Sequence, residues 1–272
     1  MMFHTLLCVL TMLLSQPDAV RCTKADSLVF ESKMQILVPQ ADLPVPELVV
    51  KTALTFLGTP YVAGTLESEP EQLTVNLRQT DCILFVAMCL GLVLTAKSED
   101  RSFQHYCDIL RNLRYRNGVV DGYASRLHYT SEWIQQAASN GIMEEITDLY
   151  GSQFEQKINF MSTHSDKYPR MAGDPEAVAA IREYEQAVES AADYHYISQE
   201  QIYAIAGKIK DGDIICFKAN IQGLDVTHVA IAYHQEGELH FIHASSSAGK
   251  VIIEPRTLAQ YAKNGIRLVR LK

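Results

Sequence analysis

The sequence predicts an α+β fold, in which helices come first and an antiparallel sheet follows. Apolar residues recur at helical spacing in several segments before residue 192. After residue 213 the pattern changes to short runs rich in β-branched residues, with turn formers such as Asp211-Gly212 and Glu236-Gly237 around them. A series of helices followed by a series of strands is typical of an α+β arrangement.

The helical part carries clear start signals at two positions. Segment 45–57 has apolar residues at helical spacing, follows Pro44 and ends before a glycine, which predicts a helix. Segment 82–95 is apolar almost throughout and follows a polar pair, so a buried helix beginning at Asp81 or Cys82 is expected. The sequence also predicts helices at residues 103–113, 131–138 and 175–192, a hairpin at 115–129, and extended segments at 35–39, 73–77 and 158–161.

Strands are predicted in the last third of the chain, at residues 214–217, 229–233, 239–242, 251–253 and 266–269. If the second and third of these form a hairpin that turns at Glu236-Gly237, the numbers of paired residues sum to about 473. His243 then lies opposite Ala230 and diagonal to His228. The two imidazole rings can therefore approach each other on one face of the sheet.

Composition limits the classes of protein to consider. The chain has 272 residues, of which 47% are hydrophobic and 21% are charged, as in globular proteins. No linker, repeat or low-complexity tract divides the chain after residue 30, so one domain over residues 30–272 is predicted. Because the formal net charge is −8 and the pI is near 5.6, the protein would repel a phosphate backbone, and no nucleic acid partner is expected.

The first residues predict an exported protein. The apolar run at residues 6–14 is shorter than the ~20 residues that cross a bilayer as a helix. Residues 1–22 are therefore interpreted as a signal peptide, which leaves a mature protein without a transmembrane segment, expected in the periplasm. A lipid anchor on Cys22 is the less favoured alternative, because Arg21 stands where lipoprotein signals need a small residue.

One of the remaining cysteines has a distinctive setting. The cysteines after the signal peptide form no C-x-x-C pair and the histidines lack zinc-site spacing, so neither a metal nor another cofactor is expected. Cys82 begins a buried helix, where free backbone N–H groups and the positive end of the helix dipole stabilise a thiolate. Cys82 is therefore the candidate nucleophile.

A cysteine nucleophile needs a base and a group that orients the base. His228 opens one predicted strand and His243 closes the next, so both histidines qualify. Taken alone, a cysteine at a helix start and a histidine on a strand are each more often structural. Their combination with an export signal and with helices that precede strands favours catalysis.

Several motifs occur in the order found in a known group of proteins. They are Gly58-Thr-Pro-Tyr61, Thr80-Asp-Cys82, Gly212-Asp-Ile-Ile215, and His228-Val-Ala paired with His243-Ala-Ser-Ser246. With these motifs the sequence resembles the NlpC-type papain-like cell-wall hydrolases. Within that group it is most similar to the N-acetylmuramoyl-L-alanine amidase-like branch, from Pro46 to Arg270. That similarity rests on Tyr61-Val-Ala-Gly-Thr-Leu66, Val75-Asn-Leu77, Tyr115-Arg-Asn-Gly118, Ser125-Arg-Leu-His-Tyr129 with Trp133-Ile134, and Phe160-Met-Ser-Thr-His164.

The resemblance implies a papain-like core with insertions between the helices and the sheet. It implies that Cys82 is the nucleophile, His228 the base and His243 the orienting residue, while the Tyr61 hydroxyl and the Cys82 backbone N–H bind the oxyanion. The implied reaction is hydrolysis of the amide between N-acetylmuramic acid, in its 1,6-anhydro form, and L-alanine in muropeptides. No cofactor is implied.

By the same resemblance, the inserted segments flank the cleft and bind the substrate. The arginines among their residues would hold carboxylates, and the tyrosine and tryptophan would stack on sugar faces. The expected substrate-binding residues are Arg114, Arg116, Arg126, His128, Tyr129, Trp133 and His164. Solvated arginines and a core tryptophan are equally ordinary interpretations. Two other functions also stay open, namely cleavage of the γ-D-glutamyl–diamino acid bond by the same mechanism, and wall binding without catalysis.

Overall fold

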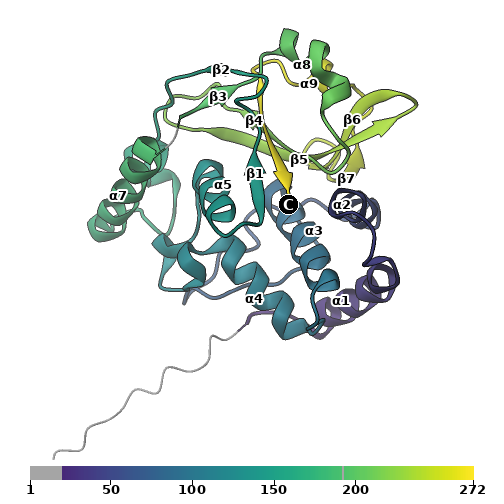
Figure 1. Ribbon diagram of the computed structural model, residues 1–272. Helices are drawn as coiled ribbons and strands as arrows, with labels where there is room; N and C mark the ends of the chain where they lie inside the picture. Colours follow the sequence, from purple (N-terminus) through teal and green to yellow (C-terminus); the bar gives the residue numbers. More distant parts are fainter. Residues whose placement is uncertain (1–19, 192) are drawn as a thin grey trace, which may run out of the picture.

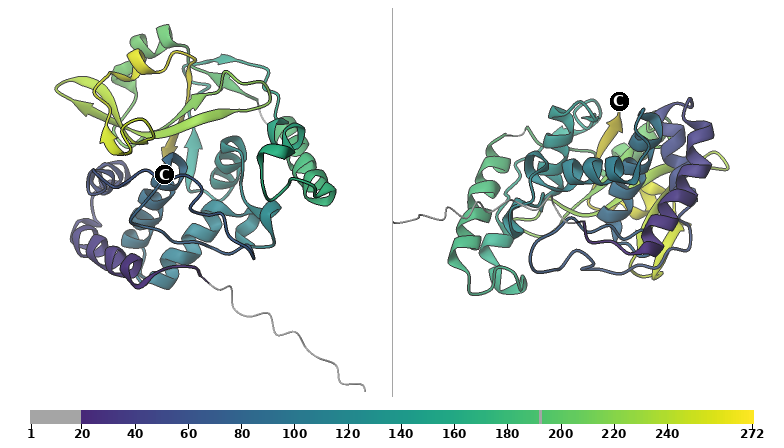
Figure 2. Two further views of the ribbon diagram at one scale, coloured as in Figure 1. Left: turned by 180° about the vertical axis from the view of Figure 1, so that it is seen from behind. Right: turned by 90° about the horizontal axis from the view of Figure 1, so that it is seen from below.

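A six-stranded antiparallel sheet separates two groups of helices in the computed structural model, which describes residues 20–191 and 193–272 (Figure 1). The apolar run at residues 6–14, predicted to belong to a signal peptide, lies outside the described residues. Helices α1 to α5 lie on one side of the sheet, and α8 and α9 lie on the other. The reverse view in Figure 2 shows the same layers. The prediction of an α+β fold with early helices packed on a late antiparallel sheet is confirmed.

The elements have the following bounds. The helices are α1 Lys24–Leu37, α2 Val45–Leu54, α3 Cys82–Lys97, α4 Phe103–Arg114, α5 Thr130–Ser139, α6 Phe160–Thr163, α7 Pro175–Ala191, α8 Gln199–Ile205 and α9 Leu258–Tyr261. The strands are β1 Met143–Glu145, β2 Ser152–Gln153, β3 His195–Tyr196, β4 Ile214–Lys218, β5 Val226–Gln235, β6 Glu238–Ser245, β7 Lys250–Ile253 and β8 Ile266–Leu271. The main sheet has the strand order β1-β8-β4-β5-β6-β7, and β2 pairs with β3 separately.

The β5–β6 hairpin has the predicted register. Ile231 pairs with Ile242 and Ala232 with Phe241, so one further step places His243 opposite Ala230. The turn at Glu236-Gly237 takes positive φ at both residues, a conformation that favours a two-residue hairpin turn. This register brings the His228 and His243 rings together on one face of the sheet.

Alternation along the central strands divides the core into two parts. Ile214 and Ile231 face α3 and belong to the larger core, whereas Ile215 and Phe217 face α8 and α9. Successive residues of a strand point to opposite faces, so nearly continuous apolar strands are expected for a sheet that is covered on both sides.

Helix α3 lies at the centre of the larger core. Its N-cap Asp81 accepts a hydrogen bond from the Leu84 N–H at 2.9 Å, as expected for an aspartate cap. Its neighbours are α1, α2 and α4 together with β5 and β6, which explains why the helix is apolar on every face. The helix therefore presents Cys82, at its first turn, to the start of β5. Within the described part of the chain, no helix has the length and apolarity needed to cross a membrane.

Several predicted segments are wrong. Residues 35–39 belong to α1 and a 3-10 turn, and residues 158–161 lead into the short helix α6. Residues 73–77 form only an isolated bridge with Arg21, and Leu77 N–H donates to Asp26. The predicted hairpin 115–129 is two 3-10 turns closed by a single bridge between Tyr115 and Arg126.

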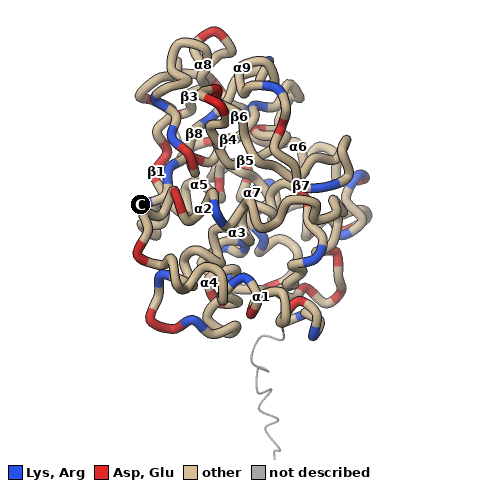
Figure 3. Tube along the Cα trace, turned by 90° about the vertical axis from the view of Figure 1, so that its right-hand side faces the viewer, with Lys and Arg blue, Asp and Glu red and all other residues tan. Residues whose placement is uncertain are grey.

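Structured residues occur ahead of the predicted domain start at residue 30. Helix α1 begins at Lys24, and Arg21 pairs with the 73–75 segment. Strands β1, β2 and β3 and helix α8 carried no local pattern that predicted them. Along the chain, Lys and Arg alternate with Asp and Glu, and Figure 3 shows no long stretch of one sign in the described residues.

Candidate active site

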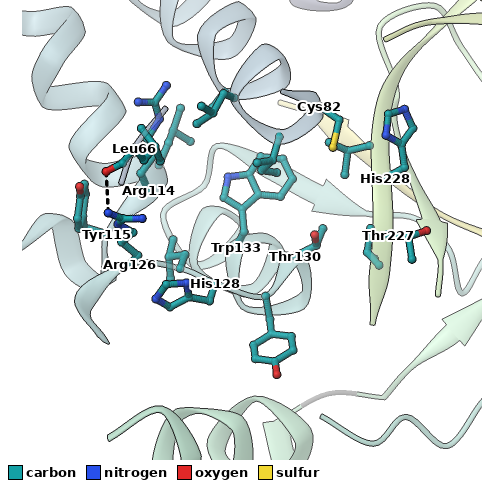
Figure 4. A pocket seen from close by; sticks show the side chains of 18 residues that line it. Leu66, Cys82, Arg114, Tyr115, Arg126, His128, Thr130, Trp133, Thr227 and His228 are labelled. Atoms are coloured by element: carbon teal, nitrogen blue, oxygen red, sulfur yellow. Dashed lines mark hydrogen bonds between the residues drawn. The ribbon is translucent and has the colours of Figure 1, made fainter. Parts of the chain in front are cut away.

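The thiol of Cys82 lies against the start of strand β5. Its sulfur is within hydrogen-bond reach of the backbone N–H groups of Val229 on β5 and of Ile83 on its own helix. Residue 228 immediately precedes Val229, so this contact places the thiol near the backbone of His228. Figure 4 shows both side chains facing one end of the same cavity.

A short chain of polar contacts leads from His228 into the protein. The Nε2 atom of His228 is 2.7 Å from Nδ1 of His243, and Nε2 of His243 is 3.3 Å from a carboxylate oxygen of Glu254. The second contact is within ion-pair distance, although its geometry is not that of a hydrogen bond. A carboxylate only accepts, so it favours a proton on Nε2 of His243; Nδ1 of His243 then accepts from Nε2–H of His228. This arrangement leaves Nδ1 of His228 with a lone pair.

Aromatic rings enclose the two histidines. Phe217 lies against His228, and Phe241 and Tyr261 lie against His243, with centroid distances between 4.9 and 5.9 Å. Burial and, to a lesser extent, His243 lower the pKa of His228 to about 3, and burial lowers the pKa of His243 to about 4. The charge of Glu254 acts in the opposite direction on both rings. Both imidazoles are therefore neutral near pH 7, and His228 has a lone pair for a proton.

The thiol is also neutral in this structure. Burial and, to a lesser extent, the charge of Asp81 raise the pKa of Cys82 to about 11, although the backbone N–H groups act in the opposite direction. Burial therefore acts against the thiolate that the helix N-terminus was expected to stabilise, because burying a charge is costly.

Tyr61 is held close to the thiol by backbone contacts. Its N–H donates to the Gly249 carbonyl at 2.9 Å, and it forms a bridge with Thr80, two residues before Cys82. Burial raises the pKa of its phenol, and the nearby Cys82 and Asp81 raise it further. The hydroxyl thus stays protonated and able to donate, although Tyr61 does not line the cavity.

The cavity has a volume of about 290 Å³ and runs from the thiol past Trp133 to a group of arginines (Figure 4). Of the residues predicted for the site, those that line it are Cys82, His228, Arg114, Arg126, His128, Tyr129 and Trp133. Those outside its lining are Tyr61, His243, Arg116 and His164. His164 contacts the Phe160 carbonyl and stacks on the Phe160 ring.

Some predicted substrate residues already have structural partners. The Tyr129 hydroxyl donates to Glu185 at 2.6 Å and accepts from the Met161 N–H, which ties α5 to α6 and α7. His128 Nε2 donates to the Tyr123 carbonyl at 2.9 Å. The rings of Tyr129 and His128 can still contact a ligand, but their bonded polar atoms are engaged.

Glu254 is the site residue that the sequence analysis missed. It follows β7, its side chain is almost fully buried, and its N–H donates to the Phe241 carbonyl. The only signal in the sequence is a lone glutamate directly after an apolar strand. The β6–β7 pairing, in which His243 is opposite Ile252, is needed to place Glu254 near the imidazole.

Comparison with known families places the protein in a class. A family model described as AmiA-like, N-acetylmuramoyl-L-alanine amidase-like, matches residues 51–266. The chain belongs to this family and is accordingly a hydrolase of the peptidoglycan amidase type. Among curated proteins, none matches the chain.

Solved structures agree with the family assignment. An N-acetylmuramoyl-L-alanine amidase from Bacteroides uniformis is 35% identical, with a TM-score of 0.79 over 84% of this chain and 99% of that one. A protein described as a putative xylanase from Bacteroides fragilis is 37% identical, with a TM-score of 0.76 over 81% and 99% of the two chains. The two names differ, and the family match agrees with the amidase. A Legionella pneumophila protein, 20% identical with a TM-score of 0.67 over 90% and 94%, shares the fold.

Proposed function

We propose that the protein is a cysteine amidase that hydrolyses the bond between N-acetylmuramic acid, in its 1,6-anhydro form, and L-alanine in peptidoglycan fragments. The observation that carries the proposal is the meeting of Cys82 and His228 at one end of a cavity, with His243 at 2.7 Å behind His228. A papain-like mechanism needs a thiol, a base and an orienting group in this order. The family match supplies the class of bond.

In the first half of the reaction, Nδ1 of His228 accepts the thiol proton while the Cys82 sulfur attacks the amide carbonyl carbon. The backbone N–H of Cys82 and the hydroxyl of Tyr61 donate to the resulting oxyanion. The carbon–nitrogen bond then breaks, and His228 returns the proton to the amine of L-alanine. The products of this half are the free peptide and a thioester between Cys82 and the muramic acid carbonyl.

In the second half, water replaces the amine. His228 takes a proton from water as the water oxygen attacks the thioester. The carbon–sulfur bond then breaks, and His228 returns the proton to the Cys82 sulfur as muramic acid leaves. His228 carries a positive charge during each proton transfer. His243 holds its tautomer, and the Glu254 carboxylate offsets that charge from behind.

The proposal includes export to the periplasm, where peptidoglycan fragments are released. It rests on the apolar run at residues 6–14. Fractionation of cells that express the full chain checks it, and recovery of all protein in the cytosol would contradict it.

Product mass from one defined substrate tests the reaction. Incubation of the full chain with an anhydro-N-acetylmuramyl tetrapeptide is expected to release the free tetrapeptide and the sugar. Release of a sugar-linked dipeptide instead would show γ-D-glutamyl endopeptidase activity. Absence of any product would favour a wall-binding protein.

Two single cysteine variants test the nucleophile in the same assay. Cys82→Ala is expected to abolish turnover, because it removes the attacking atom. Cys22→Ser, which changes an exposed cysteine, is the matched control and retains turnover. Undiminished turnover in the Cys82→Ala protein would rule out the assigned nucleophile.

A further inference from the structure

The three arginines expected to hold substrate carboxylates have different partners. Arg116 forms an ion pair with Glu132, and Arg126 forms ion pairs with Glu67 and Glu71 at 2.8 and 2.6 Å. The charges of both are therefore balanced inside the protein. Arg114 has no carboxylate within ion-pair distance among the described residues.

Arg114 is buried with its charge unbalanced. The residue is only 9% exposed. Its Nη1 atom donates to the Thr74 carbonyl at 2.8 Å, and its Nε atom has no hydrogen-bond partner. Burial lowers its pKa, and the negative charge of Asp81 acts on it from beyond ion-pair distance. A buried guanidinium without a counter-ion is costly, so an anion at this position stabilises the protein.

A second donor without a partner lies in the same cavity. Trp133 is 3% exposed and lines the cavity, yet its indole Nε1 makes no hydrogen bond. Figure 4 places its ring between Cys82 and Arg114. A buried N–H without an acceptor costs about 1–3 kcal/mol, and a ligand acceptor removes that cost.

We propose that Trp133 and Arg114 form a subsite for a free carboxylate on the leaving peptide of the substrate. The subsite rests on the proposed function and specifies which part of the substrate occupies the cavity. The lactyl carboxyl of the sugar is consumed in the scissile amide, so the sugar side offers no anion. The peptide offers one a few bonds from the scissile carbonyl. Its second residue is joined through the γ-carboxyl, which leaves the α-carboxylate free.

Trp133 acts in this subsite as a hydrogen-bond donor rather than only as a stacking surface. Its N–H donates to one carboxylate oxygen, and the positive charge of Arg114 offsets the charge of the group. Arg126 cannot replace Arg114, because Glu67 and Glu71 already neutralise it. The subsite therefore selects for charge as well as for shape.

Two substrates that differ in one group test the subsite. Anhydro-N-acetylmuramyl-L-alanyl-γ-D-glutamyl-L-lysine carries the free α-carboxylate, and the same tripeptide with D-isoglutamine as its second residue carries a neutral amide in its place. The wild-type protein is expected to cleave the carboxylate substrate with a kcat/KM roughly tenfold or more above that of the amide substrate. Because both rates come from one protein sample, their ratio does not depend on the fraction of protein that is folded.

Variants assign the preference to residues. Arg114→Met is expected to bring the ratio close to one by lowering kcat/KM for the carboxylate substrate alone. Trp133→Phe keeps the ring, removes the N–H and is expected to lower kcat/KM for both substrates, because an amide carbonyl also accepts. Equal cleavage of both substrates by the wild-type protein, or an unchanged ratio in Arg114→Met, would overturn the subsite and leave the amidase function standing. Cleavage of neither substrate would instead count against the amidase function.

Discussion

The two ends of the cavity differ in which of the polar groups that line it have partners. At the reacting end, the Cys82 sulfur lies against backbone N–H groups, and His228 contacts His243. At the other end, Arg114 Nε and Trp133 Nε1 are buried without partners. Under the proposed function, the reacting end is organised before substrate arrives, whereas the far end needs an acceptor from the substrate. The proposed reaction thus needs polar groups that are already held in place, whereas substrate binding needs polar groups that are still free to bond.

The elements that build the two ends explain this difference. The reacting end comes from α3, β5 and β6, which lie in the two main cores and cannot shift independently of them. The far end comes from the end of α4, from α5 and from the irregular segment 115–129. Variation in that segment can change substrate preference without disturbing the catalytic residues.

The largest effect is expected at the reacting end. His228→Gln removes the proton acceptor while it keeps a polar side chain of similar size. We expect kcat on the anhydromuramyl peptide to fall roughly 10²–10⁴-fold. KM should change little, because the far end binds the peptide. A loss that appears in KM with kcat unchanged would show that His228 binds substrate and that another group is the base.

The next largest effect is a difference in the free energy of unfolding between variants of Arg126 and Arg114. Arg126→Met leaves the Glu71 carboxylate, whose side chain is 2% exposed, without its main partner, and is expected to lower the free energy of unfolding by about 3 kcal/mol. Arg114→Met removes a costly buried charge together with one hydrogen bond, and because these two effects oppose each other the free energy of unfolding is expected to change by less than about 1 kcal/mol. Urea unfolding of both variants measures the difference. Equal losses would mean that Arg114 has a structural counter-ion and that the far end is already paired.

Sequence patterns predicted the start of α3 and the register of the β5–β6 hairpin because the signals for both are local. An aspartate cap before an apolar run located the start of α3, and the Glu236-Gly237 turn set the β5–β6 register. The rest depends on contacts between residues far apart in the chain. The missed pairing of the 73–77 segment involves Arg21, and Arg126 finds Glu71 across 55 residues. No spacing rule says which of several arginines meets a carboxylate.

The protonation state of Cys82 could not be predicted for a related reason. A helix start is visible in sequence, and it favours a thiolate. Burial of the sulfur against β5 is a property of the packed molecule, and it outweighs the helix. Glu254 was missed in the same way, since its role depends on the β6–β7 pairing rather than on its neighbours in the chain.

The smallest effect concerns the residue behind the histidine pair. The charge of Glu254 raises the pKa of both His228 and His243, against the lowering by burial. Glu254→Gln removes that charge, so the pKa of His228 should fall further below its value of about 3. The ring stays neutral at pH 7, but the imidazolium formed during each proton transfer becomes less stable. We expect kcat to fall about tenfold for each unit by which the pKa of His228 falls. In the pH profile of kcat/KM, the acid limb should move to lower pH.

Arg256→Gln is the matched control for this prediction. Arg256 bonds to Glu254 at 2.6 Å, and its charge lowers the pKa of His243. Its removal should therefore move the acid limb in the opposite direction, to higher pH, with kcat retained. If both variants move the limb the same way, or if Glu254→Gln lowers activity without moving it, Glu254 affects the site through packing alone. Opposite shifts of the acid limb would instead show that the Glu254 charge acts on the two histidines from the buried side of the sheet.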